Sequence, residues 1–106
     1  MAGRESCMQE LLPKGLAETV PPLYATEGEA DPVVRVHLFS RLMGWDWYLT
    51  EYDPETGEAF GYVRGFAGEW GYVSVPELEA ANARCGMPVV ERDLAFRPAP
   101  FSGAVR

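Results

Sequence analysis

The stretch of residues 45–75, WDWYLTEYDPETGEAFGYVRGFAGEWGYVSV, decides the fold, because it combines strand-forming rings with two tight turns. We expect strands over residues 45–53, 58–66 and 71–74, each rich in the aromatic and β-branched side chains that favour a pleated sheet. In the first of them, apolar and polar side chains alternate with the period of a strand. The stretch therefore predicts an antiparallel meander at the centre of the fold.

Two turns connect these predicted strands. Residues 53–57, DPETG, are typical of a hairpin turn. Asp53 can accept main-chain hydrogen bonds, Pro54 presets its backbone angle, and Gly57 tolerates the left-handed conformation that closes the turn. A glycine at position 68 predicts the second turn, at residues 68–69.

The rest of the chain predicts two short helices and two more strands. The first helix is expected over residues 13–20, and the second begins at Ser74, a capping serine with glutamate three residues later, and ends at Gly86. Period-2 patterns predict strands over residues 33–39 and 89–96. We therefore expect an α+β fold, an antiparallel sheet of four to five strands with a central meander and two short helices packed on it.

The length of 106 residues is that of a single domain. We expect that domain to span residues 11–101, after a flexible or loosely ordered N-terminus at residues 1–10 and before a C-terminal tail at residues 102–106. The two cysteines, Cys7 and Cys85, show neither a CxxC motif nor metal-ligand spacing. We expect reduced thiols, with Cys85 in the core.

The chain is acidic, with a formal net charge of -7 from 16 acidic and 9 basic side chains. Such a surface repels phosphate backbones, so direct binding of nucleic acid is not expected, and a basic protein surface is the natural partner. No apolar run approaches the ~20 residues of a membrane span. We therefore expect a cytoplasmic protein that binds no membrane.

Carboxylates near the first turn are the strongest candidates for a binding surface, with no cofactor and no metal expected. They could imitate phosphates and occupy a basic groove. The alternative is a metal-dependent enzyme acting on nucleic acid, in which Glu51 and Asp53, two apart on one strand, share a metal ion with Glu91 or Asp93. The expected partner-binding residues are Glu51, Asp53, Glu55, Glu58 and Glu69.

The aromatic side chains allow a further reading, in which an exposed sheet face stacks bases. That function needs basic residues between the rings, and residues 45–75 contain only Arg64. Core packing is expected for most rings, and an exposed remainder rimmed by acids suits a protein interface. The rings in question are Tyr48, Tyr52, Phe60, Tyr62 and Trp70. The single histidine, His37, stands in no metal or catalytic motif and is expected on a strand surface.

Four runs of sequence resemble, in order, the small bacterial family catalogued as domain of unknown function 2958. These runs are LYATEGEADPVVRV (residues 23–36), GWDWYLTEYDPETGEAFGYVRG (44–65), EWGYVSVPELEA (69–80) and GMPVVERDLAFRPAP (86–100). The resemblance implies a context of plasmids, integrative elements and phages, and transfers no catalytic residues.

Together, the residues and the resemblance predict a non-enzymatic binding module. It would inhibit or modulate a nucleic-acid-handling host complex, with anti-defence activity such as anti-CRISPR or anti-restriction as its concrete form. An accessory protein of plasmid maintenance is equally compatible with the sequence.

Overall fold

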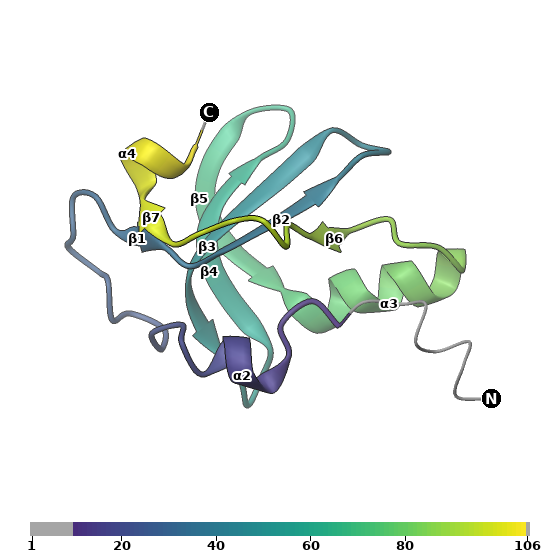
Figure 1. The fold of residues 1–106 in the computed structure, drawn as a ribbon, viewed down its shortest axis with the longest axis horizontal. Helices are drawn as coiled ribbons and strands as arrows, with labels where there is room; N and C mark the ends of the chain where they lie inside the picture. Colours follow the sequence, from purple (N-terminus) through teal and green to yellow (C-terminus); the bar gives the residue numbers. More distant parts are fainter. Residues whose placement is uncertain (1–9, 106) are drawn as a thin grey trace.

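A computed structural model describes residues 10–105 of the chain. Five antiparallel strands form the main sheet in the order β5-β4-β3-β2-β6, and a small second sheet pairs β1 with β7. The expected α+β fold with a central meander is confirmed (Figure 1). The strands are β1 Val33–Val34, β2 Val36–Ser40, β3 Trp45–Asp53, β4 Glu58–Arg64, β5 Gly68–Ser74, β6 Glu91–Arg92 and β7 Ala99–Pro100, and the helices are α2 Lys14–Ala17, α3 Val75–Cys85 and α4 Phe101–Ala104.

Three expected strands are divided or shorter in the structure, the one over residues 58–66 only by its last two residues. The strand predicted over residues 33–39 divides at Arg35, where β1 leaves the main sheet to pair with β7. The Arg35 N–H still donates to the Leu49 carbonyl at 2.8 Å, so the chain stays beside β3 through the break. The strand predicted over residues 89–96 contracts to β6, because only two of its residues pair with β2.

The second turn lies three residues earlier than the sequence predicts. Gly68 is already part of β5, paired with Arg64, and the turn consists of residues 65–67. The space beside Gly68 is occupied by the end of the Tyr62 side chain, whose hydroxyl a Cβ atom at this position would overlap. The glycine that indicated a turn therefore serves the close approach of a cross-strand ring.

A β-bulge in β3 changes which side chains share a face of the sheet. The register with β4 shifts between Leu49 and Glu51, so Trp47, Leu49 and Tyr52 all contribute to the main core. Strict alternation along β3 would place Tyr52 on the face opposite Trp47, whereas the bulge brings both to the same face. Segment 11–20, α3 and residues 89–90 cover the core face.

The opposite face carries a smaller core at the end where α4 packs. Val34, Tyr48 and Ala104 are buried there, with Phe101 packed against them. The expected tail at residues 102–106 is therefore wrong for residues 102–104, which belong to α4 and include a buried side chain. The expectation of a loose N-terminus falls on residues 1–9, outside the described residues, and on Glu10.

Helix α3 begins and ends as the sequence predicts. The Glu77 N–H donates to Ser74 Oγ at 3.3 Å, and Gly86 caps the C-terminus with φ 68°. The buried Asn82 side chain bonds both the N–H and the carbonyl of Val90, at 2.8 and 2.9 Å, and fixes the chain that follows the helix. Cys85 is exposed, which corrects its expected place in the core. Figure 1 shows α3 and α4 at opposite ends of the sheet.

Gly61 and Gly71 face each other across β4 and β5 and provide a matched test of the packing. A Cβ atom on Gly61 would overlap the Tyr48 carbonyl oxygen and lie 2.8 Å from Leu49 Cα, whereas Gly71 has no atom within 4 Å of that position. We expect Gly61→Ala to lower the free energy of unfolding by about 1–3 kcal/mol. Gly71→Ala should keep it or raise it by about 0.5 kcal/mol in the same urea titration. Equal stabilities of the two variants would contradict this packing.

Candidate functional site

The candidate site is a pocket of about 280 Å³ on the face of the sheet opposite the main core. Its floor and one wall come from Glu51 on β3, Phe60 on β4, and Trp70 and Tyr72 on β5. The other wall is the loop of residues 24–32, which connects the first helix to β1. Strand side chains and a long loop, far apart in sequence, thus enclose one cavity.

The buried carboxylate of Glu51 holds the first part of this loop. Glu51 is 3% exposed, and its Oε1 accepts the Tyr24 N–H at 2.7 Å. Its Oε2 accepts the Thr26 N–H at 2.9 Å and the Thr26 hydroxyl. Tyr24 has a positive φ of 74°, unusual for a bulky residue, so these bonds hold a strained backbone.

The second part of the loop is attached to α4. The Asp31 carboxylate accepts the Ser102 N–H at 2.9 Å and the Ser102 hydroxyl at 2.7 Å. These bonds lower the pKa of Asp31 below its ordinary value. The Phe101 N–H also donates to the Pro32 carbonyl at 2.9 Å. Because the loop is held at both ends, its middle forms a preformed rim above the rings.

Aromatic side chains line the strand side of the pocket. The Phe60 ring stacks on Trp70 with centroids 5.8 Å apart, and the Tyr72 centroid lies 4.9 Å from that of Phe60. Trp70 in turn packs on Phe101 of α4 at 4.8 Å. Desolvation raises the pKa of Tyr72, as do a hydrogen bond to the Tyr24 side chain and the nearby carboxylates. Tyr72 therefore remains a neutral hydrogen-bonding group at the pocket mouth.

Exposed carboxylates complete the site. Glu27 and Glu29 line the pocket from the loop, and both are exposed. Glu58 lies two residues before Phe60 on β4, near enough to affect the Tyr72 hydroxyl. Aromatic faces beside carboxylates attract a guanidinium or an ammonium group through cation–π and ion-pair interactions. The arrangement is thus suited to binding an organic cation.

The structure does not bring the five predicted partner-binding residues together on one surface. Glu51 is buried and bonded to the loop, so its expected place on an exposed acidic surface is wrong. Glu69 pairs with Val63 and lies on the opposite face from Glu58, which pairs with Ser74. Asp53, Glu55 and Glu58 stay together around the first turn, where Asp53 Oδ1 accepts the Glu55 N–H at 2.9 Å.

The carboxylates of the metal-dependent alternative also have separate partners. Glu91 pairs with Arg41 at 3.4 Å, and Asp93 lies 2.9 Å from a His37 ring nitrogen. Within residues 10–105, no three or more His, Cys, Asp or Glu side chains are grouped so that they could share a metal ion.

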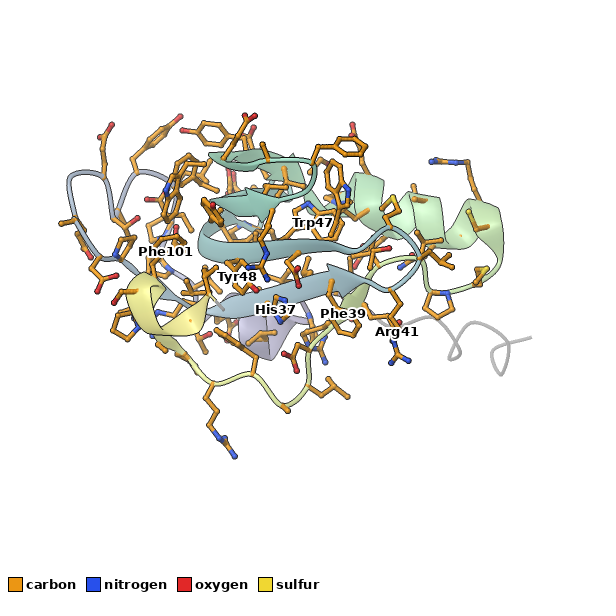
Figure 2. The ribbon with its side chains drawn as sticks, turned by 90° about the horizontal axis from the view of Figure 1, so that it is seen from above. His37, Phe39, Arg41, Trp47, Tyr48 and Phe101 are labelled. Carbon is orange, nitrogen blue, oxygen red and sulfur yellow. The ribbon has the colours of Figure 1, made fainter. Side chains whose placement is uncertain are left out.

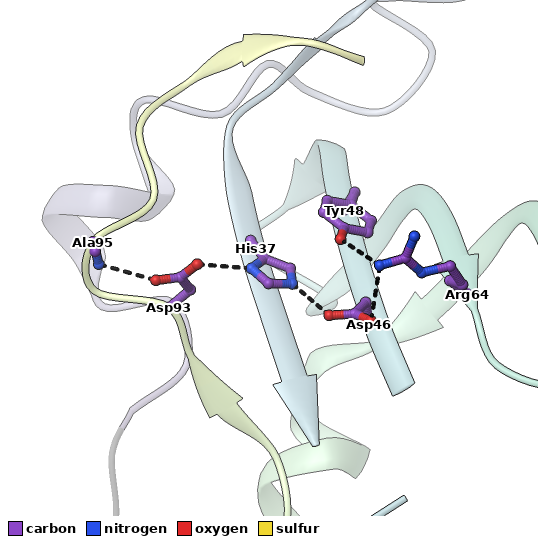
Figure 3. Close-up of polar contacts among 6 residues, drawn as sticks. All are labelled: His37, Asp46, Tyr48, Arg64, Asp93 and Ala95. Carbon is purple, nitrogen blue, oxygen red and sulfur yellow. Dashed lines mark hydrogen bonds and ion pairs between the residues drawn. The ribbon is translucent and has the colours of Figure 1, made fainter. Parts of the chain in front are cut away.

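His37 is the centre of a polar cluster on the same face of the sheet. Its Nε2 lies 2.7 Å from Asp46 and its Nδ1 lies 2.9 Å from Asp93, while its ring stacks on Tyr48 at 4.6 Å (Figures 2 and 3). Arg64 completes the cluster by donating to Asp46 and to the Tyr48 hydroxyl. Each ring nitrogen of His37 thus faces a carboxylate. This cluster fastens the C-terminal segment to β2.

Sequence reasoning missed both the loop wall of the pocket and the partners of His37. The acidic residues 25–32 follow Tyr24 as a stretch without strand or helix periodicity, and no local pattern shows that residues 24–26 fold against β3. The positions of Asp46 and Tyr48 follow from the register of β2 with β3, in which His37 faces Tyr48. A predicted hairpin register would have revealed that contact.

Replacing the buried Glu51 tests whether its carboxylate holds the pocket wall. Glu51→Gln leaves an amide group facing the main-chain donors of Tyr24 and Thr26, so we expect a loss of about 1–3 kcal/mol in the free energy of unfolding. The exposed control Glu55→Gln should change it by less than about 0.5 kcal/mol. Urea unfolding measures both. Equal stability of the Glu51→Gln protein and the parent would contradict this role.

Asp93 provides a test by pH. The hydrogen bond from His37 lowers the pKa of Asp93, against partial desolvation. A carboxyl group whose pKa is lower in the folded than in the unfolded protein stabilises the fold at pH values above its unfolded pKa of about 3.9. That contribution is lost as the pH falls through the pKa of the folded protein. We therefore expect Asp93→Asn to be less stable than the parent at pH 6, by about 1 kcal/mol, with the difference shrinking toward pH 2. Parallel pH profiles would contradict the assignment.

Comparison with known proteins identifies a family without assigning a reaction. No curated protein and no solved structure matches the chain. None of the helices formed by residues 10–105 is long and apolar enough to cross a membrane. The model of the family described as "Protein of unknown function (DUF2958)" matches residues 8–102, nearly the whole chain. The chain therefore belongs to the DUF2958 family.

Proposed function

We propose that the protein is a non-enzymatic binding module that holds a basic surface of another protein at the pocket between β3–β5 and the loop of residues 24–32. The observation that carries this proposal is the pocket itself, in which exposed aromatic rings and carboxylates surround one preformed cavity. Because Glu51 and Asp31 already hold the loop, little conformational entropy remains to be lost when a ligand enters.

The chemistry of the pocket favours an arginine or lysine side chain. A cation over Trp70 or Tyr72 gains about 0.5–2 kcal/mol from the ring, depending on its desolvation. Glu27 and Glu29 add ion pairs at the exposed rim. The formal net charge of -7 attracts a basic partner over a longer distance, and it does so most strongly at low ionic strength.

We propose a nucleic-acid-handling host complex as the class of partner. Its nucleic-acid groove carries a high density of exposed arginine and lysine. An acidic module that occupies such a groove excludes the nucleic acid, which is the anti-defence activity that the family context favours. Asp53, Glu55 and Glu58 at the first turn extend the acidic surface beyond the pocket and take the place of phosphates in this proposal.

The affinity for a synthetic peptide of alternating arginine and valine tests the basic-partner proposal by isothermal titration calorimetry. We expect the Glu27→Gln/Glu29→Gln variant to bind about tenfold more weakly than the parent, because both rim carboxylates are lost. The control Glu18→Gln/Glu77→Gln removes the same charge from exposed positions outside the pocket lining and should change affinity by less than about threefold. Equal losses in the two variants would overturn the pocket as the site.

The class of partner needs a second measurement. The parent protein and the Glu27→Gln/Glu29→Gln variant are each used to recover partners from host lysate. Each complex that only the parent recovers is then titrated with the parent in the presence of labelled DNA or RNA. We expect release of the nucleic acid. A recovered complex that keeps its nucleic acid fully bound would refute competition as the mechanism.

A further inference from the structure

We infer that the basic partner is bound by strand addition, in which an extended basic segment pairs with the outer edge of β5 as a sixth strand of the sheet. This inference rests on the proposed function and specifies how the partner is held. Its occupant is a polypeptide in extended conformation with arginine or lysine at alternate positions. Three features of β5 support it: its open edge, the direction of its main-chain groups, and a pocket on each of its faces.

Strand β5 is the terminal strand of the main sheet, and within residues 10–105 no other strand pairs with its outer side. Its pairing with β4 is continuous from Gly68 to Ser74, with no bulge to twist the edge away. Proteins commonly protect such edges with lysine, proline or a bulge. Here the seven residues GEWGYVS include a single charged residue, Glu69. The strand is therefore a long, regular template for pairing.

The register shows which main-chain groups point outward. Val75 N–H donates to the Gly57 carbonyl at 2.9 Å, so residues 57 and 75 form a hydrogen-bonded pair one step beyond β4 and β5. In an antiparallel ladder, hydrogen-bonded and non-hydrogen-bonded pairs alternate. Trp70 and Tyr72 therefore belong to non-hydrogen-bonded pairs, and their N–H and carbonyl groups face the open edge. Gly71, between them, bonds inward to β4.

Each face of β5 carries a pocket next to this edge. The first is the 280 Å³ pocket described above, on the face of Phe60. The second, of about 330 Å³, lies on the opposite face, where Trp45, Val63 and Phe66 line it. Phe66 is 100% exposed although its ring packs edge-on against Trp45 at 5.6 Å. Because successive side chains of a strand point to opposite faces, an added strand would place its side chains alternately in the first and the second pocket.

Charge selects the occupant. Glu27 and Glu29 line the first pocket and Glu69 lines the second, so basic side chains are favoured along the edge. Glu58 adds a negative charge near the Tyr72 hydroxyl. The largely apolar second pocket accommodates a β-branched side chain between the basic ones. A second copy of the chain is disfavoured, since each copy carries a formal charge of -7. The occupant is thus a basic strand of a different protein.

Main-chain methylation of the peptide tests strand addition directly. Only every second N–H of an added strand faces β5, so we compare two arginine–valine peptides, one N-methylated at its arginines and the other at its valines. We expect one of them to bind the native protein at least tenfold more weakly than the unmethylated peptide, and the other to bind within about threefold of it, because a methyl group blocks pairing only where the N–H faces the edge.

Hydrogen exchange provides the complementary readout on the protein. On adding the unmethylated peptide, we expect slower exchange at the outward amides of Trp70 and Tyr72, and no change at Gly71, which is already bonded. An unmethylated peptide that binds, with both methylated forms binding equally well or with no protection at Trp70 and Tyr72, would overturn strand addition and leave the basic-partner proposal standing. No binding of the unmethylated peptide even at millimolar concentration would refute both.

Discussion

The β-bulge between Leu49 and Glu51 is the constraint on which the rest of the structure depends. By adding one residue to β3, it turns Tyr52 into the main core and turns the Glu51 carboxylate toward the opposite face. There a buried charge requires hydrogen-bond donors, and the main chain of residues 24–26 supplies them. The bulge thus determines the core on one face and the pocket wall on the other.

The two faces of the sheet have different roles for a physical reason. One face is covered by segment 11–20 and α3 and holds most of the buried apolar side chains. Among residues 10–105, the other is covered by α4, by the loop that Asp31 attaches to it and by the segment around Phe96. Trp70 and Tyr72 lie where that cover stops, 40% and 50% exposed. The rings proposed to bind a partner are thus those that the small second core leaves uncovered.

Basic and acidic side chains occupy different places in the structure. Two basic side chains near the sheet are engaged within the fold: Arg64 donates to Asp46, and Arg92 donates to the carbonyls of Glu10 and Leu11. Many acidic side chains, including Glu27, Glu29 and Glu55, are instead exposed on loops and turns. Part of this exposed acidic excess, Glu27 and Glu29, lines the pocket, and Glu69 lies on the edge strand. This arrangement supports a basic partner for the module.

The sequence by itself determined the elements with local signals: the α+β class, β3 at residues 45–53, the turn at Gly57, and α3 between Ser74 and Gly86. Strand periodicity, capping and left-handed glycines act over a few residues, so a linear pattern suffices to find them. Only the tertiary structure decided the burial of Glu51, the pairing of His37 with two aspartates, and the pocket wall at residues 24–32. Those features depend on a bulge and on contacts between distant segments, whose free energies are settled by packing in three dimensions.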